Sequence, residues 1–166
     1  MTDLEEALPL LRTNVAANLV GDGATRAAPL FWGADAAAQL KATVNGGRGA
    51  DVLIVADCLY IDELAGALAA TVAGLLAPNG VCVCGYGRNR SALRPFLEAA
   101  VGKHGLRARE VPRCDLDEVY QALDISVMEL CVTNGDDDGR DAGAESSAKA
   151  PKKRLKRDDD DGDDKK

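Results

Sequence analysis

The sequence predicts an α/β doubly wound domain, and three observations support this class. Apolar segments with helical spacing alternate along the chain with short apolar runs typical of strands. Two of these runs, residues 52–56 and 81–85, are almost continuously apolar, as expected of buried strands in a sheet covered on both faces. A third run, residues 125–132, alternates apolar and polar side chains and reads as the closing strand. We therefore expect a mostly parallel sheet that ends in an antiparallel pair of strands.

The first predicted element is an amphipathic helix over residues 4–19. Thr2 or Asp3 would cap it, and Gly21-Asp22-Gly23 would end this unit. Residues 29–33 are a short apolar piece that closes a strand, whereas residues 34–44 fit either a helix or a loop. The apolar side chains at helical spacing are Leu4, Leu8, Leu11, Val15 and Leu19.

The second half of the predicted domain alternates regularly. Residue 52 opens a strand, residues 61–76 form a helix, and Pro78-Asn79-Gly80 is a turn that precedes the strand at 81–85. Residues 91–104 then form a helix, with Ser91 as its N-cap and Gly105 past its end. A strand starting at Val111 and the strand at 125–132 complete the pattern.

Composition excludes some classes of protein. The 166 residues carry a net charge of −7, so phosphates repel the chain and we expect no nucleic-acid partner. We expect no membrane association either, because no apolar run reaches the roughly 18 residues of a membrane span. Hydrophobic residues make up 46% and aromatic residues 4%, which predicts a core built mostly from Ala, Val and Leu.

Five cysteines, an odd number, indicate reduced thiols in an intracellular protein. Cys82 and Cys84 are two residues apart in a predicted strand, so both side chains point to one face of the sheet. Zinc sites usually combine C-x2-C pairs with further ligands at matching spacing, and no such pattern occurs in the sequence. We therefore predict buried small side chains at these positions and no metal site.

A change in composition divides the chain after residue 133. Residues 1–133 form the predicted domain, whereas residues 134–166 hold few large apolar side chains and two acidic runs, which predicts disorder. Within this tail, the basic segment Pro-Lys-Lys-Arg-Leu-Lys-Arg at 151–157 fits a nuclear localisation signal, or a solvated tail with balanced charges. The expected location is cytoplasmic, nuclear or both.

A carboxylate and a phenol follow the strand at 52–56. Asp57 and Tyr60 lie just past its carboxyl end, where α/β sheets bind their ligands. An alternative is that Asp57 caps the following helix and Tyr60 is a packed aromatic at the helix start.

Several segments together resemble the methyltransferase-like 21 type of seven-stranded methyltransferases, whose fold is Rossmann-like. They are T-D-L-E-E-A-L-P-L-L-R-T-N-V-A-A-N at 2–18, F-W-G at 31–33, A-D-V-L-I-V-A-D-C-L-Y at 50–60, V-C-V-C-G-Y-G-R-N-R at 81–90 and D-I-S-V-M-E-L at 124–130. The resemblance covers roughly residues 1–132. It implies an S-adenosylmethionine-dependent protein-lysine methyltransferase whose partner is a protein that carries the target lysine; it leaves the oligomeric state open.

The resemblance implies roles for individual residues. Asp3 would accept hydrogen bonds from the ribose of the cofactor, Trp32 would pack on its adenine, and Ala56 would line its site. Asp57 and Tyr60 match a D-x-x-Y motif beside the methyl donor and the substrate lysine, and are the candidate catalytic residues. Asp3 could also be a helix cap and Trp32 a core residue. Arg88 and Arg90 follow a strand after which this family often carries basic residues.

One departure from the family pattern concerns its first strand and the glycine-rich loop that follows it. The sequence starts immediately before Asp3, so we expect an N-terminally truncated domain whose sheet either closes the gap or leaves strand edges unpaired. Gly21-Asp22-Gly23 does not replace the loop, because it follows a helix. The alternative function is a non-catalytic methyltransferase remnant that acts as a protein-binding module.

Overall fold

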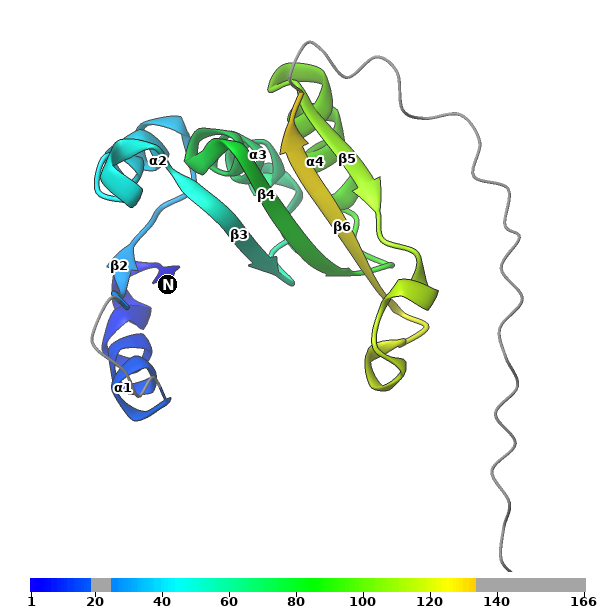
Figure 1. Ribbon diagram of the computed structural model, residues 1–166, viewed down its shortest axis with the longest axis horizontal. Coiled ribbons are helices and arrows are strands. Elements are labelled where there is room, and N and C mark those ends of the chain that lie inside the picture. Colours follow the sequence, from blue (N-terminus) through cyan, green and yellow to red (C-terminus); the bar gives the residue numbers. More distant parts are fainter. Residues whose placement is uncertain (19–24, 134–166) are drawn as a thin grey trace, which may run out of the picture. The chain divides into compact units, whose positions relative to one another are not determined.

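A computed structural model of the chain describes residues 1–18 and 25–133 and confirms the α/β class (Figure 1). The predicted tail at 134–166, its basic segment at 151–157 and the Gly21-Asp22-Gly23 turn lie outside the described residues. The strands are β1 (Thr2–Asp3), β2 (Ala28–Pro29), β3 (Ala50–Ala56), β4 (Leu76–Gly87), β5 (Leu106–Glu110) and β6 (Ile125–Val132). The α-helices are α1 (Leu8–Asn18), α2 (Ala34–Lys41), α3 (Ala65–Leu75) and α4 (Leu93–Leu97), and α4 continues as a π-helix, η4 (Glu98–Lys103). Short 3₁₀ helices are η1 (Glu5–Ala7), η2 (Asn45–Gly47), η3 (Asp62–Leu64), η5 (Arg113–Asp115) and η6 (Glu118–Tyr120).

The described strands pair in two separate sheets. β1 and β2 form a parallel pair, and the second sheet has the order β3-β4-β6-β5. In that sheet β3 is parallel to β4, whereas β6 is antiparallel to both β4 and β5, which confirms the predicted antiparallel pair at the C-terminal end. β3 therefore has one edge with which no described strand pairs. This outcome matches the second of the two expected alternatives, a sheet that leaves an edge unpaired.

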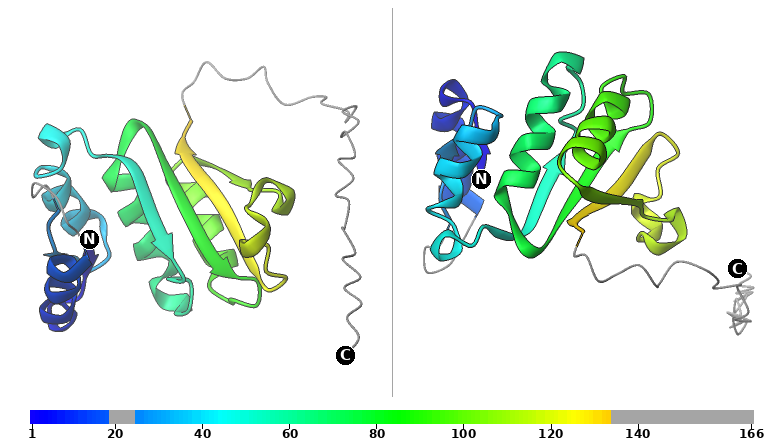
Figure 2. Two further views of the ribbon diagram at one scale, coloured as in Figure 1. Left: turned by 60° about the horizontal axis from the view of Figure 1, so that its bottom comes forward. Right: turned by 90° about the horizontal axis from the view of Figure 1, so that it is seen from above.

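Helices α3 and α4 cover one face of the four-stranded sheet, and no described helix covers the other (Figure 2). Side chains of a strand alternate between the two faces. On β3, Val55 is buried, whereas Val52 is 61% and Ile54 75% exposed. The predicted burial of residues 52–56 is therefore wrong for Val52 and Ile54, because their face of the sheet lacks a covering layer within the described residues.

The main core lies between the sheet and the covering helices α3 and α4. Its largest fully buried side chains include Leu59, Val72, Phe96, Leu106 and Leu130, and buried alanines of α3 and η4 fill the space between them. This confirms the expected Ala, Val and Leu core. In the part of the chain that the structure describes, no helix is long and apolar enough to span a bilayer.

Cys82 and Cys84 are both fully buried on the helix-covered face of β4, as predicted for small core side chains. Burial raises the pKa of each thiol to about 12, and the neighbouring thiols add to the effect. Both cysteines are therefore neutral thiols at physiological pH. No cluster of three side chains with metal-ligand chemistry occurs among residues 1–18 and 25–133.

Two predicted helix caps are wrong. Thr2 and Asp3 belong to β1 and pair with β2, so the first helical turn, η1, starts at Glu5 with Leu4 as its N-cap residue and no side-chain cap. Ser91 donates its hydroxyl to Asp62 Oδ1 at 2.6 Å, and the helix after it starts at Leu93. Gly105, with a φ of +64°, follows that helical segment as predicted.

The boundaries of two strands also differ from the prediction. β4 begins at Leu76, ahead of the expected Pro78-Asn79-Gly80 turn, and its register against β3 shifts between Ala50 and Val52. Gly80 is required there, since a Cβ on it would lie 2.4 Å from the Ala50 carbonyl oxygen. β5 ends at Glu110, so Val111 follows a strand rather than starting one.

Candidate functional site

Asp57 stands in a strained backbone conformation at the carboxyl end of β3. Its φ is +51°, in the left-handed region, and its amide donates to the Gly85 carbonyl of β4 at 2.8 Å. For a residue other than glycine this region costs roughly 1–2 kcal/mol. Strain of this kind clusters at functional positions, where the surrounding structure enforces it.

Arg90 holds the Asp57 carboxylate. Its Nε donates to Oδ1 at 3.0 Å, and its Nη2 donates to Oδ1 at 2.8 Å and to Oδ2 at 2.6 Å. Arg90 comes from the loop between β4 and α4, so the ion pair joins the carboxyl ends of two adjacent parallel strands. The alternative role of Asp57 as a helix cap is wrong, because η3 has Ile61 as its N-cap residue and no side-chain cap.

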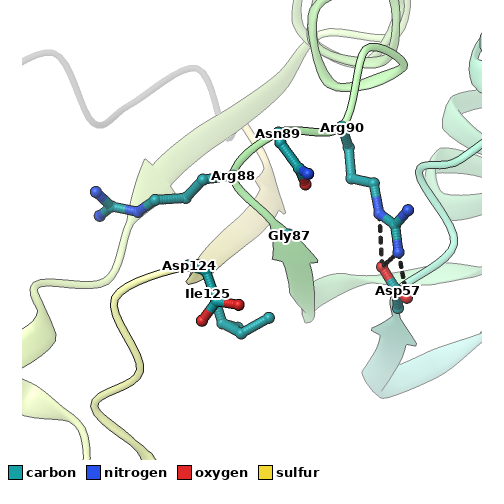
Figure 3. A pocket seen from close by; sticks show the side chains of 7 residues that line it. All are labelled: Asp57, Gly87, Arg88, Asn89, Arg90, Asp124 and Ile125. Atoms are coloured by element: carbon teal, nitrogen blue, oxygen red, sulfur yellow. Dashed lines mark hydrogen bonds and ion pairs between the residues drawn. The ribbon is translucent and has the colours of Figure 1, made fainter.

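A cavity of about 340 Å³ opens beside this ion pair (Figure 3). Its size is at the lower end of the range for small-molecule sites. The residues that line it are Asp57, Gly87, Arg88, Asn89, Arg90, Asp124 and Ile125. The cavity thus lies where β3 and β4 end and β6 begins.

The two arginines that follow β4 have different surroundings. Figure 3 shows the Arg88 side chain turned away from Asp57. Its Nε donates to Ser126 Oγ at 2.8 Å, and its Nη2 donates to Glu110 Oε1 at 3.3 Å. Arg88 therefore connects the end of β4 to β5 and β6, whereas Arg90 binds the Asp57 carboxylate.

Tyr60 is 58% exposed, so the alternative of a packed aromatic at this position is wrong. Tyr60 and Ala56 do not line the cavity at Asp57, although both are within three residues of it. The structure thus places Asp57 at the cavity and leaves Tyr60 on the surface nearby.

Cys58, directly after Asp57, donates a hydrogen bond to the Ala56 carbonyl at 3.4 Å. Burial raises its pKa, a hydrogen bond to the Ala56 carbonyl opposes this shift, and the carboxylates of Asp57 and Asp3 raise the pKa further. The thiol therefore stays neutral at physiological pH. Asp3 is exposed on β1, where its Oδ1 accepts a hydrogen bond from the Leu4 amide at 2.8 Å.

Trp32 lies three residues after the end of β2 and is half-buried. It packs against both hydrophobic clusters of the described chain, which makes it partly a core residue. The Gly33 amide donates to Thr71 Oγ1 of α3 at 2.7 Å and fixes the segment after Trp32. A second cavity of about 290 Å³ is lined by Phe31, Trp32, Gly33, Ala34, Asp35 and Ala36.

Sequence reasoning missed Gly87, Asn89, Asp124 and Ile125 as lining residues. Asp124 and Ile125 are more than sixty residues away from Asp57 in the sequence, and only the antiparallel pairing of β6 with β4 brings them to this edge. No local pattern could have identified them. Arg90 carried a signal, its position after a strand, but the sequence did not separate it from Arg88.

The fold and the site define an α/β protein with a polar site where parallel strands end. A family model described as lysine methyltransferase matches residues 1–103. The match spans more than half of the chain and includes Asp3, Trp32, Ala56, Asp57, Tyr60 and Arg90. The chain belongs to the lysine methyltransferase family.

Proposed function

We propose that the protein transfers a methyl group from S-adenosylmethionine to the side-chain nitrogen of a lysine in a protein. One observation carries the proposal: Asp57, strained at φ +51°, is held by Arg90 on the wall of a cavity at the carboxyl end of β3. Membership of the lysine methyltransferase family supports the same chemistry.

The residues present fit the nucleoside part of the donor. The exposed Asp3 carboxylate has two acceptor oxygens, and only Oδ1 is engaged by the Leu4 amide, so a vicinal diol could donate to it. The half-buried indole of Trp32 offers a flat apolar surface for a purine. Ala56 is exposed at the end of β3, directly before Asp57. The bound donor would supply a methyl group activated by its sulfonium.

The attacking lysine must be a neutral amine. With a pKa of about 10.4, a free lysine is neutral in only about one molecule in 2,500 at pH 7. We assign Asp57 the role of accepting a hydrogen bond from the amine, which directs the nitrogen lone pair toward the methyl group. As the N–C bond forms, the C–S bond breaks, and the methylated nitrogen releases a proton to solvent. Tyr60 would supply a π-rich wall or a hydroxyl acceptor beside this nitrogen.

Arg90 acts as a positioning residue in this proposal. A carboxylate offers about four acceptor positions, and the three hydrogen bonds from Arg90 leave one for a substrate amine. The guanidinium fork fixes the plane of the carboxylate, so the remaining acceptor points in one direction.

A second candidate function is a binding module without catalysis. The observation that favours it is the edge of β3 with which no strand of residues 1–18 or 25–133 pairs, together with the exposed Val52 and Ile54. Such an edge can accept a strand of another protein. This candidate uses a different part of the chain from the cavity at Asp57.

The test is transfer of labelled methyl groups by the full chain to lysine-containing proteins and peptides, with identification of the methylated amino acid. Asp57→Asn should lower the rate at least roughly a hundredfold and Tyr60→Phe about tenfold, as expected for positioned polar groups. Asp51→Asn, an exposed carboxylate at the other end of β3, serves as the matched control. Equal rates for Asp57→Asn and the wild type would refute the assigned role. A folded chain without transfer would favour the binding module.

A further inference from the structure

The connection between β5 and β6 exposes large apolar side chains. Val119 is 83%, Tyr120 74% and Leu123 76% exposed. Together with Asp117, Glu118 and Asp124 they form what we call the 117–124 surface. Single exposed apolar residues are common, but three within five positions of one short connection are typical of an interaction surface.

This connection is ordered by its own hydrogen bonds. The Asp117 carboxylate accepts from the Val119 amide at 2.9 Å, and the Asp117 carbonyl accepts from the Tyr120 amide at 2.8 Å. Gln121 Nε2 donates to the Leu116 carbonyl at 2.8 Å. The apolar side chains are thus presented by a folded turn, which reduces the entropy lost when a partner binds.

The same connection is strongly acidic. Between residues 113 and 124 it carries Asp115, Asp117, Glu118 and Asp124 against a single basic residue, Arg113. Within residues 1–18 and 25–133 no ion pair involves Glu118 or Asp124. The surface therefore presents apolar side chains beside two carboxylates, Glu118 and Asp124, that have no ion-pair partner among the described residues.

The surface continues into the cavity at Asp57. Asp124 belongs to both, and the next residue, Ile125, also lines the cavity and is 45% exposed (Figure 3). The surface lies beyond the span that the family model matches, residues 1–103.

We infer that the 117–124 surface binds a basic segment of the protein substrate that carries apolar side chains next to the target lysine. This inference rests on the proposed function. Val119, Tyr120 and Leu123 would bury the apolar side chains of that segment, and Glu118 and Asp124 would pair with its cations. The target lysine would then enter the cavity between Asp124 and Asp57.

Charge separates this partner from others. Nucleic acids and anionic lipid surfaces carry negative charge, which the carboxylates of this surface repel. A second copy of the same surface would place carboxylates against carboxylates. A basic polypeptide segment is the class that matches both the charge and the apolar groups.

The test is fluorescence anisotropy of short labelled peptides with the full chain, without donor. The probe peptide contains lysines, arginines and leucines; in one control peptide serines replace the leucines, and in another glutamates replace the basic residues. The probe should bind at least about tenfold more tightly than either control, since it alone offers both apolar and cationic groups. Raising the ionic strength from about 0.1 M to about 1 M should weaken binding, because the Debye length falls from about 10 to about 3 Å.

The double variant Val119→Ser/Leu123→Ser tests the surface directly. Both side chains are exposed, so the variant should fold, and it should bind the probe peptide at least about tenfold more weakly. Leu10→Ser, on the exposed side of α1, is the matched control and should bind like the wild type. Equal affinity of the double variant and the wild type would overturn the inference, and so would an equal loss in Leu10→Ser or no binding by the wild type.

The assay separates this inference from the proposed function. Binding that depends on Val119 and Leu123, in a chain that transfers no methyl group, would support the surface and contradict the enzyme. Methyl transfer that depends on Asp57, with binding unaffected by the double variant, would support the enzyme and overturn the surface.

Discussion

The Arg90 guanidinium holds the Asp57 carboxylate through three hydrogen bonds, at 3.0, 2.8 and 2.6 Å. The two residues are 33 positions apart in sequence. Both side chains are partly exposed, 36% for Arg90 and 60% for Asp57, so water and salt screen the pair. Its contribution to stability is therefore small, and its effect is to fix the direction of one carboxylate.

Replacing Arg90 by methionine should separate activity from stability. We expect methyl transfer to fall about tenfold or more, because the Asp57 carboxylate loses its fixed plane. The free energy of unfolding should change by less than about 1 kcal/mol, as for exposed ion pairs generally. Steady-state kinetics and urea denaturation measure the two quantities.

The matched control is Arg94→Met, which breaks the exposed ion pair of Arg94 with Glu98 on the surface of α4. It should leave the rate of methyl transfer unchanged. An Arg90→Met variant as active as Arg94→Met would show that Arg90 has no positioning role.

The left-handed conformation of Asp57 predicts an unusual order of stabilities. Asp57→Gly should unfold with a free energy within about 1 kcal/mol of the wild type, because glycine accepts a φ of +51° without strain. Asp57→Val should lose about 1–3 kcal/mol, because a β-branched side chain clashes there. The free energies of unfolding come from urea denaturation. Asp51→Val, at an exposed position of the same strand, should leave the free energy of unfolding nearly unchanged. A similar loss of stability at both positions would contradict a strained backbone at Asp57.

Stability should depend on pH in the alkaline range through Cys82 and Cys84. Their pKa is about 12 in the folded chain against 9.0 ordinarily, so the folded state retains protons that the unfolded state has lost. The contribution of these two thiols to the free energy of unfolding should stay constant below pH 9 and fall between pH 9 and 12, by up to about 1.4 kcal/mol per pH unit for each thiol. Cys82→Ala/Cys84→Ala should flatten this dependence, and Cys114→Ala, at an exposed thiol, should leave it unchanged. Denaturation at a series of pH values measures it; an unchanged slope in the double variant would refute the assignment.

The edge of β3 that no described strand covers should promote aggregation. Ile54 is 75% exposed on the uncovered face of the sheet, and a lysine at such a position opposes pairing between chains. Light scattering during incubation at a series of concentrations should show slower aggregation for Ile54→Lys than for the wild type, with little change in the free energy of unfolding. Leu10→Lys adds the same charge at an exposed position of α1. Equal protection by both variants would mean that charge alone, not the strand edge, determines aggregation.

Local sequence patterns predicted an element of the fold well where its structure depends on its own residues rather than on distant contacts. The alternating residues 125–132 form β6 with those bounds, because the alternation of apolar and polar side chains matches the two faces of a strand. The burial of Cys82 and Cys84 followed for the same reason. The failures at Thr2, Asp3 and Ser91 have another cause, since each residue has a partner distant in sequence that replaces the local cap.

The candidate site was predictable only in part. Asp57 follows a strand, and its place at the carboxyl end of β3 could be inferred from the α/β pattern. Its strain, its ion pair with Arg90 and the contribution of Asp124 arise from tertiary contacts. The apolar residues 52–56 were expected to be buried, but burial depends on a second covering layer that the apolar pattern alone does not provide.

The most direct test of the proposed methyl transfer is the binding of S-adenosylmethionine to the purified chain by calorimetry, with circular dichroism to establish that the chain is folded. The proposal predicts binding of one molecule with micromolar affinity. Asp3→Ala should weaken it about tenfold or more through the lost hydrogen bonds to the ribose, whereas Asp51→Ala, an exposed carboxylate at the other end of β3, should leave it unchanged. A folded chain that takes up no S-adenosylmethionine would contradict the proposed function and favour the binding module.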